Sequence, residues 1–225
     1  YIEGTTRKDE VIVISAHYDH VGYKGSEIYN GADDNGSGTV GLLEIAQAFN
    51  KAKADGNGPK RSILILHLTG EEYGLHVSRF YSDNPLFPLK NTVANINIDM
   101  IGRRDTKYEN TTEDYIYVVG SDRLSTELHQ INEEMNEKHV NLKLDYKYNA
   151  LNDPEQIYYR SDHYNFAKHG IPSIFYYNGG HKDYHQPGDT PDKINYELLA
   201  KRAKLAFATA WELANRENRI IADKK

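Results

Sequence analysis

The segment VIVISAHYDH, residues 11–20, joins an apolar run to a group of acidic and imidazole side chains. Residues 11–15 are almost purely apolar, as expected for a strand that is buried on both faces. Similar short runs recur along the chain and alternate with longer stretches that have helical spacing. This alternation predicts an α/β domain in which helices cover both faces of a sheet.

The period of the apolar residues indicates where the individual elements lie. Helical patterns are found at residues 37–53, 124–138, 162–169 and 195–219. Short β-rich runs predict strands at residues 11–15, 62–68, 93–99, 115–120, 142–148 and 173–177. No internal repeat and no convincing linker interrupts this pattern. We therefore expect one domain that spans residues 1–225.

The composition argues against several classes of protein. Lys and Arg number 27 against 33 for Asp and Glu, and a net charge of −6 argues against a nucleic-acid partner. The longest apolar runs are too short to span a bilayer. The chain has no cysteine, which excludes disulfides, thiolate zinc ligands and cysteine nucleophiles. Any metal ion would therefore be held by histidines and carboxylates.

Polar residues gather where several of the expected strands end, the edge at which open α/β sheets place their sites. In an extended chain His17 and Asp19 point to the same side, which suits an imidazole ligand with a carboxylate that orients it. Glycines flank the Asp33-Asp34 pair and allow a tight turn. Taken alone, a hydrogen-bonded strand-end histidine and a helix-capping turn are the simpler interpretations of these two clusters.

Three more clusters add carboxylates and imidazoles. Glu71 and Glu72 closely follow an expected strand, and two such neighbours can divide metal binding and proton transfer between them. Asp99 lies between apolar residues, and a buried carboxylate needs a partner such as a metal ion. The loop of residues 180–190 holds two histidines and two aspartates. Each cluster is weak alone, but together they supply the ligands of a two-zinc site.

The clusters and their order resemble the di-zinc aminopeptidases of metallopeptidase clan MH, family twenty-eight of the metallopeptidases. The segments that carry the resemblance are SAHYDHVG, NGADDNGSGTVGLLEIA, LTGEEYGL, NIDMIG and SDHYNFAKHGIPSIFYYNGGHKDYHQPGDTPDKI. They extend from near residue 15 to residue 194, which is most of the chain. The resemblance implies the zinc exopeptidase (phosphorylase/hydrolase-like) fold, an α/β fold with a mixed, mostly parallel β-sheet sandwiched between helices.

The resemblance also implies two Zn²⁺ ions per chain and a role for each ligand. His17 and Asp99 would bind one zinc ion, and Glu72 and His185 would bind the other. Asp34 would bridge the two ions, and the peptide bond that follows it would be cis.

The same resemblance implies the catalytic residues. Glu71 would be the general base, Asp19 would orient His17, and Tyr184 would stabilise the tetrahedral intermediate. Three further histidines fall inside the motifs but match no ligand position, so we expect them to be structural or to lie behind the ligands: His20, His163 and His181.

The implied function is that of a metallo-exopeptidase, a hydrolase that removes N-terminal residues from peptides or proteins. Three alternatives share the fold: a carboxypeptidase with the same metal cage, a glutaminyl cyclase with one zinc ion, and a non-catalytic binding relative. After the two glutamates the family commonly has small residues, whereas this chain has HVSR at residues 76–79, a departure that affects helix packing or pocket shape. Many relatives are exported with an additional N-terminal region. We therefore expect a longer precursor that is periplasmic, on the cell surface or secreted.

Overall fold

The computed structural model describes residues 1–224 and contains a six-stranded main sheet in the order β4-β1-β5-β8-β6-β7. The strands are β1 Arg7–His17, β4 Arg61–Leu68, β5 Thr92–Ile98, β6 Tyr115–Val119, β7 Lys143–Asp145 and β8 Ser173–Tyr177. Strand β6 runs antiparallel to β8, and the other neighbouring pairs are parallel. The predicted mixed, mostly parallel sheet is therefore confirmed.

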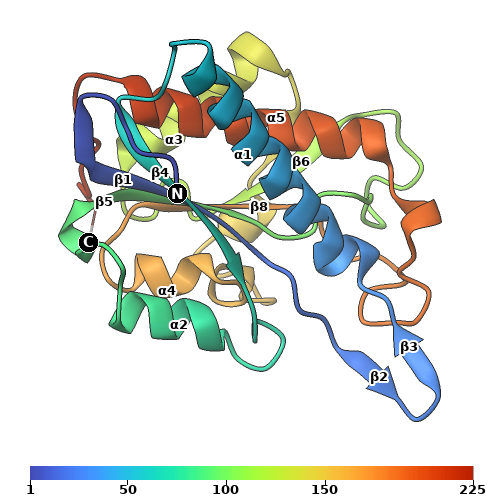
Figure 1. Ribbon diagram of the computed structural model, residues 1–225. Coiled ribbons are helices and arrows are strands. Elements are labelled where there is room, and N and C mark those ends of the chain that lie inside the picture. Colours follow the sequence, from blue (N-terminus) through green and yellow to red (C-terminus); the bar gives the residue numbers. More distant parts are fainter. Residues whose placement is uncertain (225) are drawn as a thin grey trace.

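Helices cover both faces of this sheet (Figure 1). One face carries α1 Gly38–Ala54, α3 Thr126–His139 and α5 Tyr196–Asn215, and the other carries α2 His76–Asp83 and α4 His163–Ala167. A small hairpin, β2 Gly22–Lys24 with β3 Glu27–Tyr29, projects away from the main body. The remaining short helical segments are η1 Ala32–Ser37, η2 Leu89–Asn91, η3 Lys147–Asn149, η4 Ile157–Tyr159 and η5 Pro191–Lys193.

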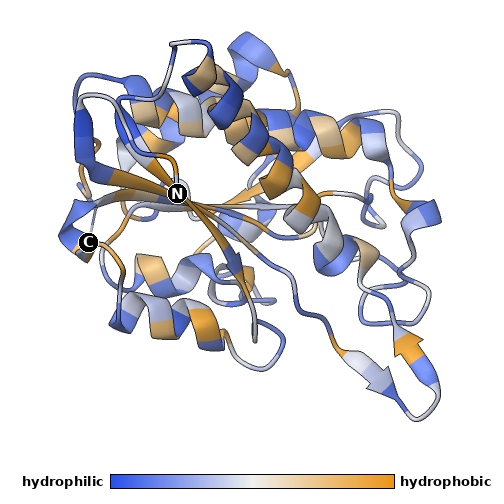
Figure 2. Cartoon of the chain, in the orientation of Figure 1, coloured by the Kyte–Doolittle hydropathy of each residue, from blue (hydrophilic) through white to orange (hydrophobic). Residues whose placement is uncertain are grey.

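Strand β1 is apolar on both faces because it packs against both helical layers. Ile12 and Ile14 belong to the large core cluster that includes side chains of α1 and α5. Val11 and Val13 point the other way, into a smaller cluster with Tyr81 of α2 and Phe166 of α4. The hydrophobic colouring of the central strands in Figure 2 reflects this two-sided burial. The fold thus holds the carboxyl end of β1 in a fixed place.

The expected elements differ from the observed ones in a few places. The strand predicted at residues 142–148 is present but shorter, because β7 ends at Asp145, whose carboxylate accepts the N–H of Lys147 at 2.9 Å and starts a turn. Helix α5 ends at Asn215 rather than at residue 219, and the guanidinium of Arg61 binds the carbonyls of Leu213 and Arg216 there. Neither helix α2 nor the β2–β3 hairpin was predicted. Within residues 1–224 no helix is both long and apolar enough to cross a membrane.

The residues that depart from the family pattern, HVSR at 76–79, form the start of α2. Ser78 in this turn is buried and accepts a hydrogen bond from Asn165 of α4 at 2.8 Å. The departure therefore affects how α2 packs on α4.

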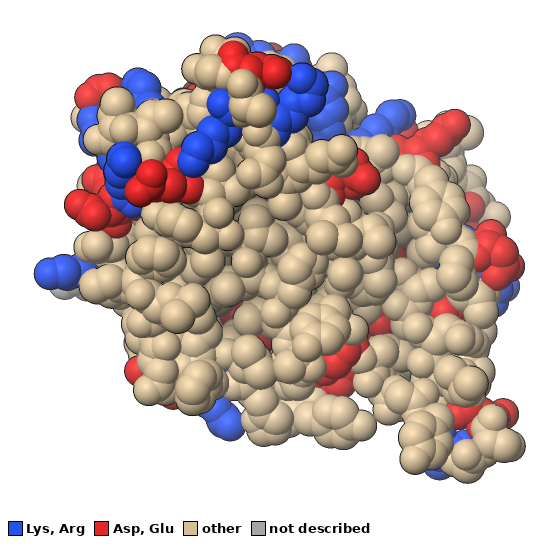
Figure 3. Space-filling view, in the orientation of Figure 1, with Lys and Arg blue, Asp and Glu red and all other residues tan. Residues whose placement is uncertain are grey.

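On the face shown in Figure 3, Lys and Arg gather along one margin and the middle is mostly uncharged, so this face has no broad basic patch.

Candidate metal centre

The carboxyl ends of three neighbouring parallel strands bring the polar clusters together. His17 is the last residue of β1, and Asp99 directly follows β5. The Glu71-Glu72 pair follows β4 after a short turn. The structure places all five expected ligands in one cluster, with donor atoms in contact across it: His17, Asp34, Glu72, Asp99 and His185.

Asp34 occupies the centre of this cluster. Its Oδ1 lies 3.4 Å from His17 Nε2, and its Oδ2 lies 3.0 Å from His185 Nε2. Asp99 Oδ1 lies 3.2 Å from the same atom of His17, and Glu72 Oε2 lies 3.0 Å from that of His185. The imidazole nearest to each oxygen of Asp34 therefore also contacts a second carboxylate.

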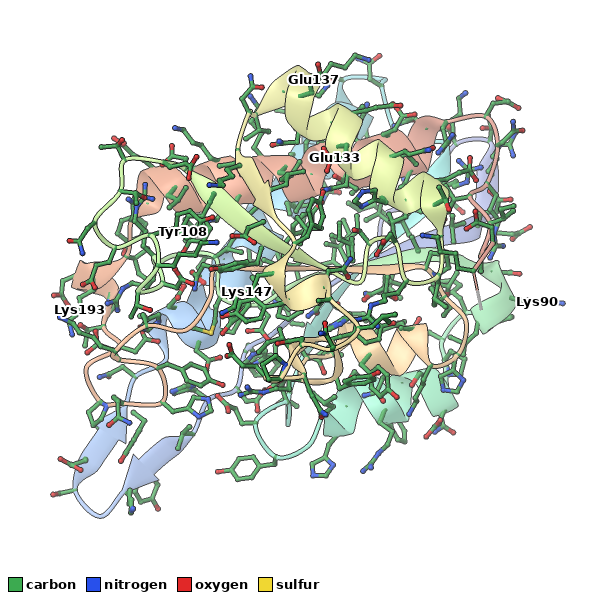
Figure 4. The ribbon with its side chains drawn as sticks, turned by 180° about the vertical axis from the view of Figure 1, so that it is seen from behind. Lys90, Tyr108, Glu133, Glu137, Lys147 and Lys193 are labelled. Atoms are coloured by element: carbon green, nitrogen blue, oxygen red, sulfur yellow. The ribbon has the colours of Figure 1, made fainter. Side chains whose placement is uncertain are left out.

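A tight turn aims Asp34 at the cluster. Gly31 enters the turn with a φ of 65°, and the peptide bond between Asp34 and Asn35 is cis, as expected. The Asp189 carboxylate accepts the N–H groups of Asp33 and Asp34 at 2.9 and 3.1 Å. The loop that supplies Asp189 also carries His185, and Lys193, labelled in Figure 4, ties this loop together by donating to Asp183 and to the Gly188 carbonyl.

The carboxylate of Asp33 points away from the cluster. It accepts hydrogen bonds from Ser37 Oγ at 2.8 Å and from the N–H of Gly102 at 2.6 Å. Its other oxygen lies 3.1 Å from Nε2 of His181, which is also outside the ligand cluster. This contact gives His181 the structural position that was expected for it.

Glu71 and Glu72 are adjacent but lie in different electrostatic surroundings. Glu71 forms a group with His17 and Asp99, whose ligand atoms all lie within 4.8 Å of one another. Burial and the neighbouring Asp99 raise the pKa of Glu71 to about 10. Burial would raise the pKa of Glu72 too, but hydrogen bonds with His185 and His20 lower it to about 2. Environments that separate two carboxyl pKa values in this way are typical of an acid–base group beside a permanently charged one.

His20 lies closer to the ligands than the sequence suggested. Its Nδ1 lies 2.8 Å from Glu72 Oε1 and 3.8 Å from Asp34 Oδ2. With Asp34 and Glu72 it forms a second group of potential ligand atoms within 4.8 Å of one another. The available signal was a second imidazole three residues after His17. His163, by contrast, is fully buried, belongs to neither group of potential ligand atoms and stacks on Phe175.

Residues behind the ligands hold them in place. His17 Nδ1 lies 3.1 Å from the backbone oxygen of Asp19 and 3.6 Å from its carboxylate, so Asp19 contacts the ring as expected. Because β1 ends at His17, this contact comes from the turn after the strand rather than from strand alternation. Ser161 donates to Asp99 Oδ2 at 2.6 Å, and Asn97 donates to Ser161 at 2.8 Å. Sequence analysis missed Ser161.

A pocket opens over the cluster. It is lined by three carboxylates, Asp34, Glu71 and Asp99, and by Met100, Ile157, Arg160, Phe175, Tyr177 and Tyr184. The Tyr184 ring stacks on His185 with 3.9 Å between centroids. Burial, followed by Asp34 and Asp99, raises the pKa of Tyr184 above its usual value. Its hydroxyl is therefore protonated at neutral pH and can donate a hydrogen bond into the pocket.

The donor atoms of this cluster fit zinc. Imidazole nitrogens and carboxylate oxygens are its usual ligands when no cysteine is present. Burial and the carboxylates of Asp99 and Glu72 raise the pKa of Asp34 to about 6, although a hydrogen bond with His185 opposes the rise. Carboxylates packed this closely need positive charge between them. Residues His17, Asp34 and Asp99 on one side, and Asp34, Glu72 and His185 on the other, offer nitrogen and oxygen ligands to a divalent metal ion.

Known proteins share this arrangement of elements. A protein from Trichophyton verrucosum named probable leucine aminopeptidase is 28% identical over 92% of this chain and 55% of its own length. The zinc aminopeptidase BSAP from Bacillus subtilis superposes with a TM-score of 0.72 at 27% identity, over 96% of this chain and 50% of that chain. A Porphyromonas gingivalis glutaminyl cyclase, at 22% identity and a TM-score of 0.69 over 89% of this chain and 72% of that one, shares the fold.

The chain spans about half the length of the curated relatives it matches. The family model described as peptidase family M28 matches residues 1–210, nearly the whole chain. This match extends over all the segments that supply the cluster. The chain therefore belongs to peptidase family M28.

Proposed function

We propose that this protein is an aminopeptidase that uses two zinc ions to hydrolyse N-terminal peptide bonds. The observation that carries the proposal is the position of Asp34, whose two oxygens face His17 and His185 separately. A bridging carboxylate between two ligand sets is what a two-metal hydrolytic site requires. The leucine aminopeptidase name of one relative and the zinc aminopeptidase structure of another support the same function.

Zinc ions bound there would polarise the scissile carbonyl and lower the pKa of water towards about 7. Glu71, whose carboxylate lies beside His17 and Asp99, would accept a proton from the attacking water and deliver it to the departing amine. Glu72, whose pKa is lowered, would remain an anionic ligand. Tyr184 would donate a hydrogen bond to the oxygen that becomes negatively charged during attack.

The pocket supports cleavage at a chain end. Buried carboxylates beside the pocket would attract the positive charge of a free α-amine. Met100, Ile157, Phe175 and Tyr177 would then surround the side chain of the N-terminal residue. The contact of His17 with both Asp34 and Asp99 favours a second metal ion over the single zinc of a glutaminyl cyclase.

The test compares matched peptides with the full-length, zinc-loaded protein. A peptide with a free N-terminus should lose its first residue, whereas the same peptide with an acetylated N-terminus should stay intact. Chelation should abolish hydrolysis, and added zinc should restore it. Release of the C-terminal residue would indicate a carboxypeptidase, and cyclisation of an N-terminal glutamine would indicate a glutaminyl cyclase. Export of the protein stays a prediction, to be tested by cell fractionation.

A further inference from the structure

Arg160 lies on the wall of the pocket, directly after η4. It is the cation among the pocket-lining residues, which otherwise comprise the three carboxylates, four apolar or aromatic side chains and Tyr184. Its guanidinium Nη2 lies 3.5 Å from the hydroxyl of Tyr184, which contacts His185 by stacking. The guanidinium is therefore placed within reach of a molecule bound over the cluster.

Within residues 1–224 Arg160 has no carboxylate within ion-pair distance. Two arginines that follow β5, Arg103 and Arg104, are each paired with an aspartate. Arg103 lies 3.0 Å from Asp183, and Arg104 lies 2.7 Å from Asp114. The long contact with Tyr184 leaves most of the five N–H donors of the Arg160 guanidinium free. The Arg160 guanidinium, whose planar N–H donors match a carboxylate, thus has no carboxylate partner among residues 1–224.

The carboxylates that line the same pocket suggest what the Arg160 guanidinium would bind. Asp34, Glu71 and Asp99 would repel a substrate carboxylate that approached the pocket, to the extent that bound metal ions did not offset their charge. A guanidinium among the residues that line the same pocket reverses that effect locally, and charge-assisted hydrogen bonds with carboxylates are among the stronger polar contacts. Arg160 would thus favour anionic substrates in a site that is itself anionic.

We propose that Arg160 is a specificity-determining residue that selects substrates with a carboxylate within one residue of the scissile bond. The inference rests on the proposed aminopeptidase function. A substrate can carry such a carboxylate in two places. One is an acidic side chain on the N-terminal residue, and the other is the C-terminal carboxylate of a dipeptide.

Two pairs of substrates, each differing only in the charge of one group, distinguish the sources. Glutamyl- and glutaminyl-p-nitroanilide differ in the side chain, and leucylglycine and its C-terminal amide differ at the C-terminus. The zinc-loaded wild type should favour the acid in one pair by at least about tenfold in kcat/KM, the size of one charge-assisted hydrogen bond. The pair that shows the preference identifies the source.

Substitution of Arg160 then assigns the preference to this side chain. In Arg160→Gln the preference should fall to about twofold or less, mainly through a higher KM for the acid, while the uncharged member keeps its kcat/KM. Arg160→Lys should retain part of the preference, because an ammonium carries the charge without the planar fork.

Three results would overturn the inference. The first is a wild type without a preference for the acid in either pair, and the second is a preference that survives in Arg160→Gln. The third is an equal loss for both members of a pair, because Arg160 would then act through Tyr184. In each of these cases the uncharged substrates are still hydrolysed by the wild type. Failure of the proposed function looks different, since no free N-terminal residue would be released from any substrate.

Discussion

Asp33 and Asp34 are neighbours in the chain, and both are almost completely buried, yet their carboxylates have different partners. The carboxylate of Asp33 is satisfied by Ser37, the Gly102 N–H and His181. The carboxylate of Asp34 instead faces two imidazoles. Burial is therefore not what distinguishes a structural carboxylate from a functional one in this turn.

The two carboxylates differ in the further contacts that their partners make. The imidazoles that face Asp34 each contact one more carboxylate, Asp99 for His17 and Glu72 for His185. The carboxylate of Asp33 contacts one imidazole, and its other hydrogen bonds come from a neutral hydroxyl and a backbone N–H. A hydrogen-bond network in which every polar atom has a partner stabilises the fold, whereas a cluster with more anionic oxygens than donors is suited to bind cations. We expect substitutions in the two regions to have different consequences.

The largest effect is expected at Glu71. Glu71→Gln keeps the shape of the side chain but removes the proton acceptor, so turnover should fall by about 10²–10⁴-fold. Zinc content should stay near that of the wild type, as measured by elemental analysis beside the turnover number.

The matched control is Glu72→Gln, which replaces an anionic ligand by a neutral one. Here zinc should bind more weakly, and activity should partly return with excess zinc. If Glu71→Gln lost zinc and Glu72→Gln kept it, the two roles would have to be exchanged. Full activity in both variants would contradict the catalytic assignment.

The next effect compares the two aspartates directly. Substitution of a residue that only hydrogen-bonds to a metal ligand typically weakens metal binding by about 10–100-fold, and Asp34→Asn should weaken zinc binding by more than that. Asp33→Asn should retain zinc and instead lower the free energy of unfolding by about 1–2 kcal/mol, because a buried network loses a charged acceptor. Zinc titration and urea unfolding of both variants check this pair. Loss of zinc from Asp33→Asn alone would reverse the comparison.

Asp189 belongs to both regions, because its carboxylate accepts the N–H of each aspartate. Asp189→Asn should leave the fold intact while the turn becomes less firmly held, so zinc affinity should fall by about 10–100-fold. Competition with a chelator measures this affinity independently of activity. Unchanged zinc affinity would show that the turn does not need Asp189 to position Asp34.

The smallest effect concerns His163, a fully buried imidazole outside both regions. Burial lowers its pKa to about 3, so below about pH 6.5 the unfolded state binds one more proton than the folded state. Stability should therefore fall as the pH is lowered, by about 1 kcal/mol between about pH 6.5 and 5.5. His163→Phe should lose this part of the pH dependence in urea unfolding of the chelated protein. An identical pH dependence in both proteins would contradict the assignment.

Much of this arrangement could be predicted from the sequence, because strands buried on two faces have a distinctive pattern. Apolar runs located the strands, and the motifs located the imidazole and carboxylate side chains that the structure brings together. The β2–β3 hairpin could not be predicted, since its strands are three residues long and mostly exposed. The contact of Asp189 with Asp34 joins residues 155 positions apart, and that of Ser161 with Asp99 joins residues 62 apart. Such contacts have no local signal in the sequence.

The zinc content of the full-length protein tests the central claim most directly. The purified protein is loaded with zinc, dialysed to remove weakly bound ions and analysed for zinc by mass spectrometry against its concentration. Because Asp34 presents one oxygen to each of two ligand sets, we expect two zinc ions per chain. One zinc ion or none in a folded protein would contradict the two-metal account.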